Sequence, residues 1–436
     1  MVDHVADHMD AASFAALVNG TDNFFLRRAV ERIRDGLFDP SGVQWLTSGK
    51  QKLDRVFDQG VARLETGQPC HVCVCGAYGQ GKSHSLAYLK QRALAENFVV
   101  SSINLDPRQT PFHDFKAVYR VLMGAMTFPD GQSSFTDVWK TAADHWLNHP
   151  DNRDRTLSDF IPEDLPHRFR AILAAMASPN MDLPPGKRKF KKHARFRPRE
   201  FPWLLKNALM GKEIPAYRLK AVFRYRQVPF YKDHSLVCKD PAQYLAAVKG
   251  LARLLKAMGY RGWMVLFDEG ESIGQTRITS RSKSYELLHE FICPDTGNQG
   301  LFPVFAFTHD FFTLVAEEPY DRTRAPRGGK SGPTAAGRKN SPEAPEPVPC
   351  FARNYHRAWK QTLNILLLQD LSARDWQGLI RRLVILHGKA YGWEPDSAAL
   401  EQAAARVLSR HGRAESRMKL RVLVNQLDLV QQGQSG

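Results

Sequence analysis

Short apolar runs alternate with amphipathic stretches along the chain. Residues 71–75 and 98–106 form two runs with strand character, and a helix-compatible stretch, 86–90, lies between them. Strand, helix and strand within about 40 residues predict a βαβ unit. Two later apolar runs, 263–267 and 301–307, predict further strands.

Apolar residues at helical spacing predict helices on both sides of these runs. Residues 12–67 are expected to be helical, with Arg27, Arg28 and Glu31 on the polar face of one stretch. Residues 356–430 are expected to be entirely helical. The other predicted helices are 114–126, 135–147 and 241–258.

Changes in composition divide the chain into segments. Residues 150–235 hold many prolines and few long apolar runs, and residues 317–349 are rich in Pro, Gly, Ser and charge. We therefore expect an N-terminal helical segment (1–67), the first part of a core (68–130), a basic helical insertion (131–238), the second part of the core (239–316), a flexible loop (317–349) and a C-terminal helical lid (350–436).

The overall composition is that of a globular protein, with 436 residues of which 43% are hydrophobic and 24% charged. No stretch approaches the roughly 20 apolar residues of a membrane span, and residues 1–8 lack the features of a signal peptide. The six cysteines form no CxxC pair, which favours reduced thiols. We expect a cytoplasmic protein with no membrane partner.

The net charge of +16 suggests a polyanionic partner, most often nucleic acid. Basic residues far outnumber acidic ones between Lys187 and Lys232, and nine aromatic residues from Phe190 to Tyr231 are interleaved with them. Such a segment can bind phosphates and stack on bases, so we expect it to bind duplex DNA. The alternative is a solvated basic loop with a small core of its own. The candidate DNA-binding residues are Lys187, Arg188, Lys189, Lys191, Lys192, Arg195, Arg197 and Arg199.

Residues 76–83 carry the candidate chemistry and are called the phosphate loop below. They read Gly76, Ala77, Tyr78, Gly79, Gln80, Gly81, Lys82 and Ser83, a complete GxxxxGK[ST] pattern between a predicted strand and a predicted helix. The glycines let backbone N–H groups crowd around phosphate oxygens, Lys82 reaches the β- and γ-phosphates, and Ser83 can ligate Mg²⁺. The alternative is a chance match on a Gly-rich turn. We add the next residue, His84, to the candidate cofactor-binding set.

An acidic pair, Asp268 and Glu269, follows the apolar run 263–267. The pattern predicts that Asp268 holds Mg²⁺ and that Glu269 polarises an attacking water. The alternative is an acidic turn that only closes a strand. Because Lys82 and Asp268 are far apart in the chain, the sequence between them must include an insertion.

Four further residues are candidates for contacts with the transferring phosphate. Thr308 ends the run 301–307 and can touch the γ-phosphate or orient the water, unless it merely caps the strand. Arg277 and Arg281 are candidate arginine fingers toward a neighbouring subunit, or else solvated loop arginines. Arg417, near the start of the last predicted helix, is a candidate to reach back over the nucleotide.

Several segments resemble the ATP-binding proteins of bacterial BREX-type phage-defence systems, a branch of the AAA+/ORC-like ATPases. They are Arg27–Gly36, Gly81–Leu86, Asn104–Asp106, Ala117–Arg120, Leu266–Glu269, the strand end at Thr308 and the Arg417–Asp428 helix. The resemblance implies an ATPase subunit that acts on or near DNA, with helicases and DNA methyltransferases as neighbours. The family's last helix often opens with Pro-Arg, where this chain has Ser416-Arg417.

We therefore expect an α/β fold with a P-loop AAA+-like αβα core, a basic insertion and a C-terminal all-helical lid. ATP and Mg²⁺ are the expected cofactors, and the absence of an NKxD motif favours ATP over GTP. The expected activity is ATP hydrolysis coupled to DNA binding or to remodelling of a partner such as a helicase, in a homo-oligomer. Two alternatives stay open: a non-motor nucleotide switch, and a DNA-binding scaffold that licenses a partner helicase, nuclease or methyltransferase.

Overall fold

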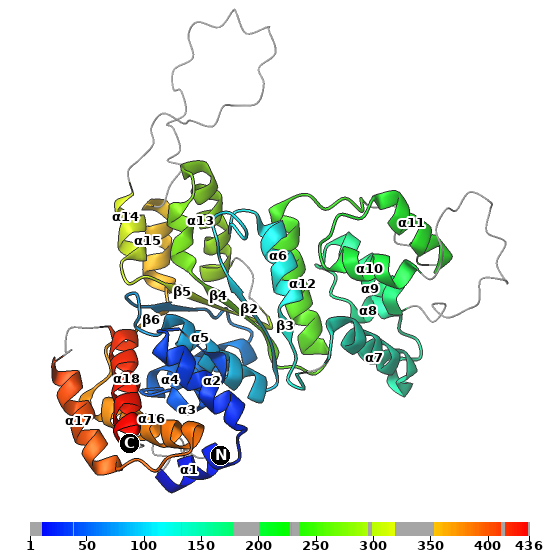
Figure 1. Ribbon diagram of the computed structural model, residues 1–436. Helices are drawn as coiled ribbons and strands as arrows, with labels where there is room; N and C mark the ends of the chain where they lie inside the picture. The colour runs from blue at the N-terminus through cyan, green and yellow to red at the C-terminus, as the bar shows by residue number, and fades with distance from the viewer. Residues whose placement is uncertain are drawn as a thin grey trace, which may run out of the picture.

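The computed structural model describes residues 11–37, 39–131, 133–177, 200–226, 228, 235–294, 299–318, 353–410 and 415–434. A six-stranded sheet lies at its centre (Figure 1). Its strands are β1 (Val72–Cys75), β2 (Phe98–Asn104), β3 (Met126–Thr127), β4 (Gly262–Asp268), β5 (Leu301–Phe307) and β6 (Ile365–Leu367). The four strands predicted from apolar runs are confirmed as β1, β2, β4 and β5.

The strand order is β3-β2-β4-β5-β1-β6, and every pair is parallel except β2 with β3. Strand β5 therefore lies between β1 and β4. The register pairs Cys75 with Phe307 and Asn104 with Asp268. Because parallel strands end at one edge of a sheet, the loop after β1 and the ends of β4 and β5 meet at that edge.

Strand β6 corrects the expectation that residues 350–436 are all-helical, since Ile365–Leu367 pairs in parallel with β1. The backbone N–H of Cys73 donates to Asn364 O at 2.8 Å, and the N–H of Leu368 donates to Cys75 O at 2.7 Å. A short apolar run does not distinguish helix from strand, and here pairing with the open edge of β1 makes residues 365–367 a strand. The two-residue strand β3 was likewise not predicted, and the helix expected over 114–126 ends at Gly124.

Helices cover both faces of the sheet, and the strands alternate accordingly. Along β4, Met264 and Leu266 pack toward one face, while Trp263, Val265 and Phe267 pack toward the other. The first face carries α4 (Gln51–Glu65) and α5 (Lys82–Ala95). The second carries α6 (Phe115–Gly124), α12 (Pro241–Ala257), α13 (Ile278–Ile292), α14 (Phe311–Glu317) and α15 (Arg353–Thr362). Full burial of both faces explains why these strands read as continuous apolar runs.

The described part of the insertion is helical and lies beside α6 and α12, on the side away from the C-terminal helices (Figure 1). Its apolar core is continuous with that of the second sheet face, and the Tyr119 ring on α6 lies 5.4 Å from the ring of Phe169. The helices are α7 (Phe135–Asn148), α8 (Leu157–Phe160), α9 (His167–Ala177), α10 (Phe201–Leu209) and α11 (Ala216–Tyr225).

The aromatic residues of the insertion divide into two groups. Phe201, Phe223 and Tyr225 are buried in the core, so packing explains them. Trp203 and Tyr217 have exposed fractions of 60% and 63%. The eight candidate DNA-binding residues, and residues 319–349 of the expected flexible loop, lie outside the described residues.

The two ends of the chain share one helical unit (Figure 1). Leu26 and Val30 of the first part pack in one apolar cluster with Leu383 and Val424 of the last part. The unit consists of α1 (Ala11–Asn19), α2 (Asn23–Arg34), α3 (Val43–Leu46), α16 (Ala373–Tyr391), α17 (Ser397–Arg410) and α18 (Ser416–Gln434).

A polar network joins the same helices. Arg34 of α2 donates two hydrogen bonds to Asp428 of α18, at 2.9 and 2.8 Å, and one to Tyr391 OH at 3.0 Å. Asp428 also lies 3.0 Å from Nε2 of His387, which is fully buried. Burial lowers the pKa of His387 although Asp428 opposes that shift. None of the helices in the described residues has the length and apolar character required to cross a membrane.

Helix α4 packs closely on β5 at Gly60, so substitution of this glycine is expected to lower stability. A Cβ on Gly60 of α4 would lie 2.2 Å from Cζ of the buried Phe302 ring. We expect Gly60→Ala to destabilise the fold by about 1–3 kcal/mol, because the ring has no room to yield. Gly378 of α16 is the matched control, since a Cβ there meets nothing within 4 Å. Gly378→Ala should stabilise by about 0.5–1 kcal/mol. Urea unfolding measures both, and equal effects would contradict the packing.

Candidate functional site

The phosphate loop connects β1 to α5, and its glycines adopt conformations that other residues disfavour. Gly79 has φ +79° and Gly81, the N-cap of α5, has φ +94°. Both values lie in the left-handed region that glycine enters at no steric cost. The loop therefore leads directly into the N-terminus of α5, where free backbone N–H groups and the helix dipole favour an anion.

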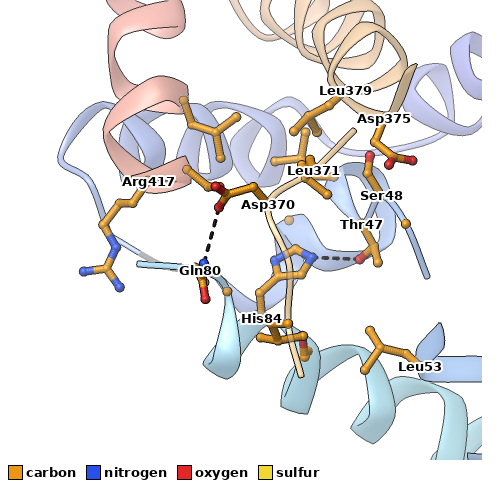
Figure 2. A pocket seen from close by; sticks show the side chains of 18 of the residues that line it. Thr47, Ser48, Leu53, Gln80, His84, Asp370, Leu371, Asp375, Leu379 and Arg417 are labelled. Atoms are coloured by element: carbon orange, nitrogen blue, oxygen red, sulfur yellow. Dashed lines mark hydrogen bonds between the residues drawn. The ribbon is translucent and has the colours of Figure 1, made fainter. Parts of the chain in front are cut away.

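Polar contacts hold the middle of the loop. The side-chain oxygen of Gln80 accepts from the Ala77 N–H at 2.6 Å, and its Nε2 donates to Asp370 at 3.3 Å. Figure 2 shows this second bond, which joins the loop to the chain that follows β6. Ser83 is half-buried in the first turn of α5.

Lys82 is buried at the start of α5, with an exposed fraction of 9%. Its Nζ donates to Gly76 O at 3.3 Å and lies 3.6 Å from Oε1 of Glu271. The ammonium group is thus held under the phosphate loop by a carbonyl and a carboxylate. Sequence reasoning missed Glu271, because only the fold shows which carboxylate of the segment after β4 lies beside Lys82.

The acidic pair lies at the carboxyl end of β4. Asp268 is buried, and its Oδ1 accepts from the backbone N–H of Glu269 at 2.9 Å. Glu269 has φ +56°, a left-handed conformation that is uncommon for a residue with a Cβ. Burial raises the pKa of Glu269, and the nearby carboxylates of Glu271 and Asp268 add to the shift. A carboxyl group with a raised pKa is better suited to accept a proton near neutral pH.

Thr308 follows β5, at the same edge of the sheet and between the ends of β1 and β4. Its hydroxyl donates to the Asp310 carboxylate, and this hydrogen bond is the main cause of a lowered pKa at Asp310. Thr308 therefore has a fixed hydroxyl orientation beside the candidate site.

The three candidate arginines lie in different places. Arg277 is exposed at the N-cap of α13, and Arg281 is ion-paired with Glu318 at 2.5 Å. Arg417 lies at the phosphate loop: its guanidinium carbon is 5.1 Å from the centroid of the Tyr78 ring, and it donates to Tyr78 OH at 3.2 Å. The structure thus brings Arg417 to the loop, and neither Arg277 nor Arg281 lines the adjoining cavity.

A cavity of about 1060 Å³ adjoins the phosphate loop. Its walls include residues 46–49 and 51–53, residues 79–85, residues 366–372, α16 and the start of α18. Figure 2 shows how side chains from these segments, including Leu53, Leu371 and Asp375, surround it. This arrangement could not be predicted from the sequence, since no motif marks the segments before α4 and after β6.

His84 lines the cavity and lies against the loop before α4. Its Nε2 is 2.8 Å from the Thr47 hydroxyl (Figure 2). The same hydroxyl is 2.6 Å from Val43 O. Because the hydroxyl has one proton to donate and the carbonyl only accepts, Nε2 of His84 carries a proton and donates. Burial lowers the pKa of His84 to about 4, with Arg382 contributing, so the ring is neutral at physiological pH.

The model of the family described as BREX system ATP-binding protein BrxC/D matches residues 26–159 and 238–316. The chain belongs to this family. The matched ranges contain the phosphate loop, Asp268 and Glu269, and Thr308, but not the candidate DNA-binding block or Arg417.

Membership confirms the resemblance and assigns the chain to an ATP-binding role in a phage-defence system. No curated protein and no solved structure matches the chain. The individual roles of site residues therefore rest on geometry.

The contact between Arg417 and Tyr78 is expected to stabilise the start of α18. An exposed cation–π contact contributes about 0.5–1 kcal/mol, so its loss should raise local opening of the helix start about two- to five-fold. Tyr78→Ala should speed hydrogen exchange of the α18 amides at residues 419–424, and Tyr78→Phe should do so less. Amides of α12 are the internal control. Unchanged exchange at 419–424 in Tyr78→Ala would show that the contact does not hold the helix.

Proposed function

We propose that this chain binds Mg²⁺–ATP at the phosphate loop and hydrolyses it, with the sheet and its helices acting as an AAA+-like P-loop core. One observation carries the proposal: the phosphate loop, the Asp268–Glu269 pair and Thr308 share one edge of the sheet, and the phosphate loop and Glu269 line a cavity of about 1060 Å³. A cavity of this size can take a nucleoside triphosphate. The helical unit formed by α16–α18 with α1–α3 would act as the lid.

Each catalytic residue has a role that its position supports. The Lys82 ammonium group binds β- and γ-phosphate oxygens, and the N–H groups at the start of α5 bind the same phosphates. Glu269, with its raised pKa, accepts a proton from the attacking water. Thr308 orients that water or contacts the γ-phosphate, and Arg417 neutralises phosphate charge from the lid.

The oxygen ligands that the chain offers would bind Mg²⁺ only together with oxygens of the nucleotide phosphates. The described residues contain no group of three or more His, Cys, Asp or Glu side chains that could hold a metal alone. Mg²⁺ is commonly bound by one or two protein oxygens together with substrate phosphates. Ser83 and Asp268 would supply those oxygens, and bound Mg²⁺ would neutralise charge on the phosphates.

The basic surplus supports a further part of the proposal, that the ATP cycle is coupled to DNA. The net charge of +16 provides the affinity for a polyanion, and the block at 187–199 concentrates it. We propose a cytoplasmic homo-oligomer that works with other proteins of the defence system. The exposed Arg277 is the better placed of the two finger candidates, because Arg281 is already paired with Glu318.

A nucleotide switch is the second candidate function, and a Glu269 variant separates it from a motor. In both cases Lys82→Ala should raise the Kd for ATP about 30-fold or more. Truncation of one partner of a buried charge pair costs about 2 kcal/mol or more of binding free energy, which corresponds to that factor. Glu269→Gln should retain ATP binding while hydrolysis falls about 10²–10⁴-fold. Calorimetry and steady-state phosphate release measure the two effects. Hydrolysis unaffected by Glu269→Gln would overturn its assignment as the base. A variant that no longer hydrolyses ATP but still supports defence would favour the switch.

The DNA proposal has its own test. Binding to duplex DNA should weaken steeply with salt, and removing two phosphate contacts should lower the slope of log K against log salt by about 2. The test variant replaces Lys187 and Lys189 by Gln. The control replaces Lys256 and Lys389, two exposed lysines on α12 and α16, in the same way. Equal slopes for the two variants would show that the basic block makes no phosphate contacts.

A further inference from the structure

The ammonium group of Lys82 already has a partner where phosphate is proposed to bind. Its Nζ lies 3.6 Å from Oε1 of Glu271, and the two side chains have exposed fractions of only 10% and 18%. Glu271 belongs to the short 3₁₀ segment Gly270–Gln275 that follows the acidic pair. The ion pair therefore links the phosphate loop to the segment after β4.

The second carboxylate oxygen of Glu271 has an unusual environment. Oε2 is buried and has no hydrogen-bond partner among the described residues. A buried carboxylate with one unsatisfied oxygen is costly, and its main compensation here is the nearby ammonium group. The position of Glu271 is thus held chiefly by Lys82. Any anion that binds the Lys82 ammonium group must displace this carboxylate or lie close to it.

We propose that Glu271 is a counter-ion that pairs with Lys82 while no nucleotide is bound and is exchanged for phosphate when nucleotide binds. This inference rests on the proposed function, because it requires that phosphate reaches Lys82. Glu271 is a positioning residue, since it acts through Lys82. Its release on binding would also transmit nucleotide occupancy to the segment that carries Glu269.

Competition between Glu271 and phosphate for Lys82 predicts the direction in which nucleotide affinity changes when the Glu271 charge is removed. Removing the negative charge frees Lys82 from a competitor and removes a repulsion, so nucleotide affinity should rise. Couplings between sites typically change affinity 5–150-fold, and we expect about ten-fold here. The gain should depend on phosphate, and adenosine, which has none, should bind equally well with or without the charge.

The experiment compares the parent protein with Glu271→Gln, which keeps the shape of the side chain but replaces one acceptor oxygen by an uncharged NH₂ donor. Glu286→Gln is the matched control, because Glu286 is exposed on α13 and the charge change is the same. Kd values for adenosine, ADP and ATP are measured by calorimetry, in EDTA and in Mg²⁺. Thermal unfolding without nucleotide establishes that each variant is folded.

The inference predicts that Glu271→Gln binds ADP and ATP about ten-fold more tightly than the parent in EDTA, with adenosine unchanged and Glu286→Gln like the parent. Equal nucleotide affinities for parent and Glu271→Gln would overturn it. Weaker binding in Mg²⁺ with no change in EDTA would also overturn it, in favour of a metal ligand. A parent that binds none of the three probes would instead refute the proposed function itself.

Discussion

The parallel register of β1, β5 and β4 is the constraint on which the candidate site depends. Neighbouring strands lie about 4.8 Å apart, so the insertion of β5 sets the ends of β1 and β4 about 10 Å from each other. That gap is wide enough for a phosphate group, a metal ion and a water between the loop and the acidic pair. Direct pairing of β1 with β4 would leave no such space. The long insertion between Lys82 and Asp268 is tolerated because it packs beside α6 and α12 and leaves the strand ends open.

The helical unit made from both chain ends gives the site a second wall. Arg417 at the start of α18 contacts Tyr78 of the phosphate loop, and its side chain also passes Gly36, where a Cβ would lie 3.9 Å from it. The network of Arg34 with Asp428 fixes α18 to α2. A change at the phosphate loop would therefore reach α2 and α18 together. A bound nucleotide would shift such a unit only if it interacted differently with two positions of the unit. Arg417 is a charged side chain of the unit that contacts the phosphate loop.

The sequence predicted the parts of this arrangement that depend on local pattern. Buried strands read as apolar runs, and the phosphate loop requires glycines at fixed positions, so β1, β2, β4, β5 and residues 76–83 were found. Strand β6 was missed because Ile365–Leu367 owes its conformation to the open edge of β1, which lies far away in the chain. The core shared by Leu26 and Val424 is also a long-range contact that leaves no periodic signal. Glu271 was missed for a related reason, since only the fold reveals which carboxylate faces Lys82.

Carboxylates outnumber the buried Lys82 ammonium group at the sheet edge where nucleotide is proposed to bind. Three carboxyl groups, on Asp268, Glu269 and Glu271, lie at this edge near the buried ammonium group of Lys82. Burial raises the pKa of Glu269, and the other two carboxylates add to the shift. A free triphosphate would add several negative charges to this group at close range, where water screens poorly. Nucleotide that arrives with Mg²⁺ brings less charge and supplies a cation for Asp268. Under the proposed function, the site would therefore favour the metal complex over free nucleotide, and release of the nucleotide would return Lys82 to its carboxylate partner, Glu271.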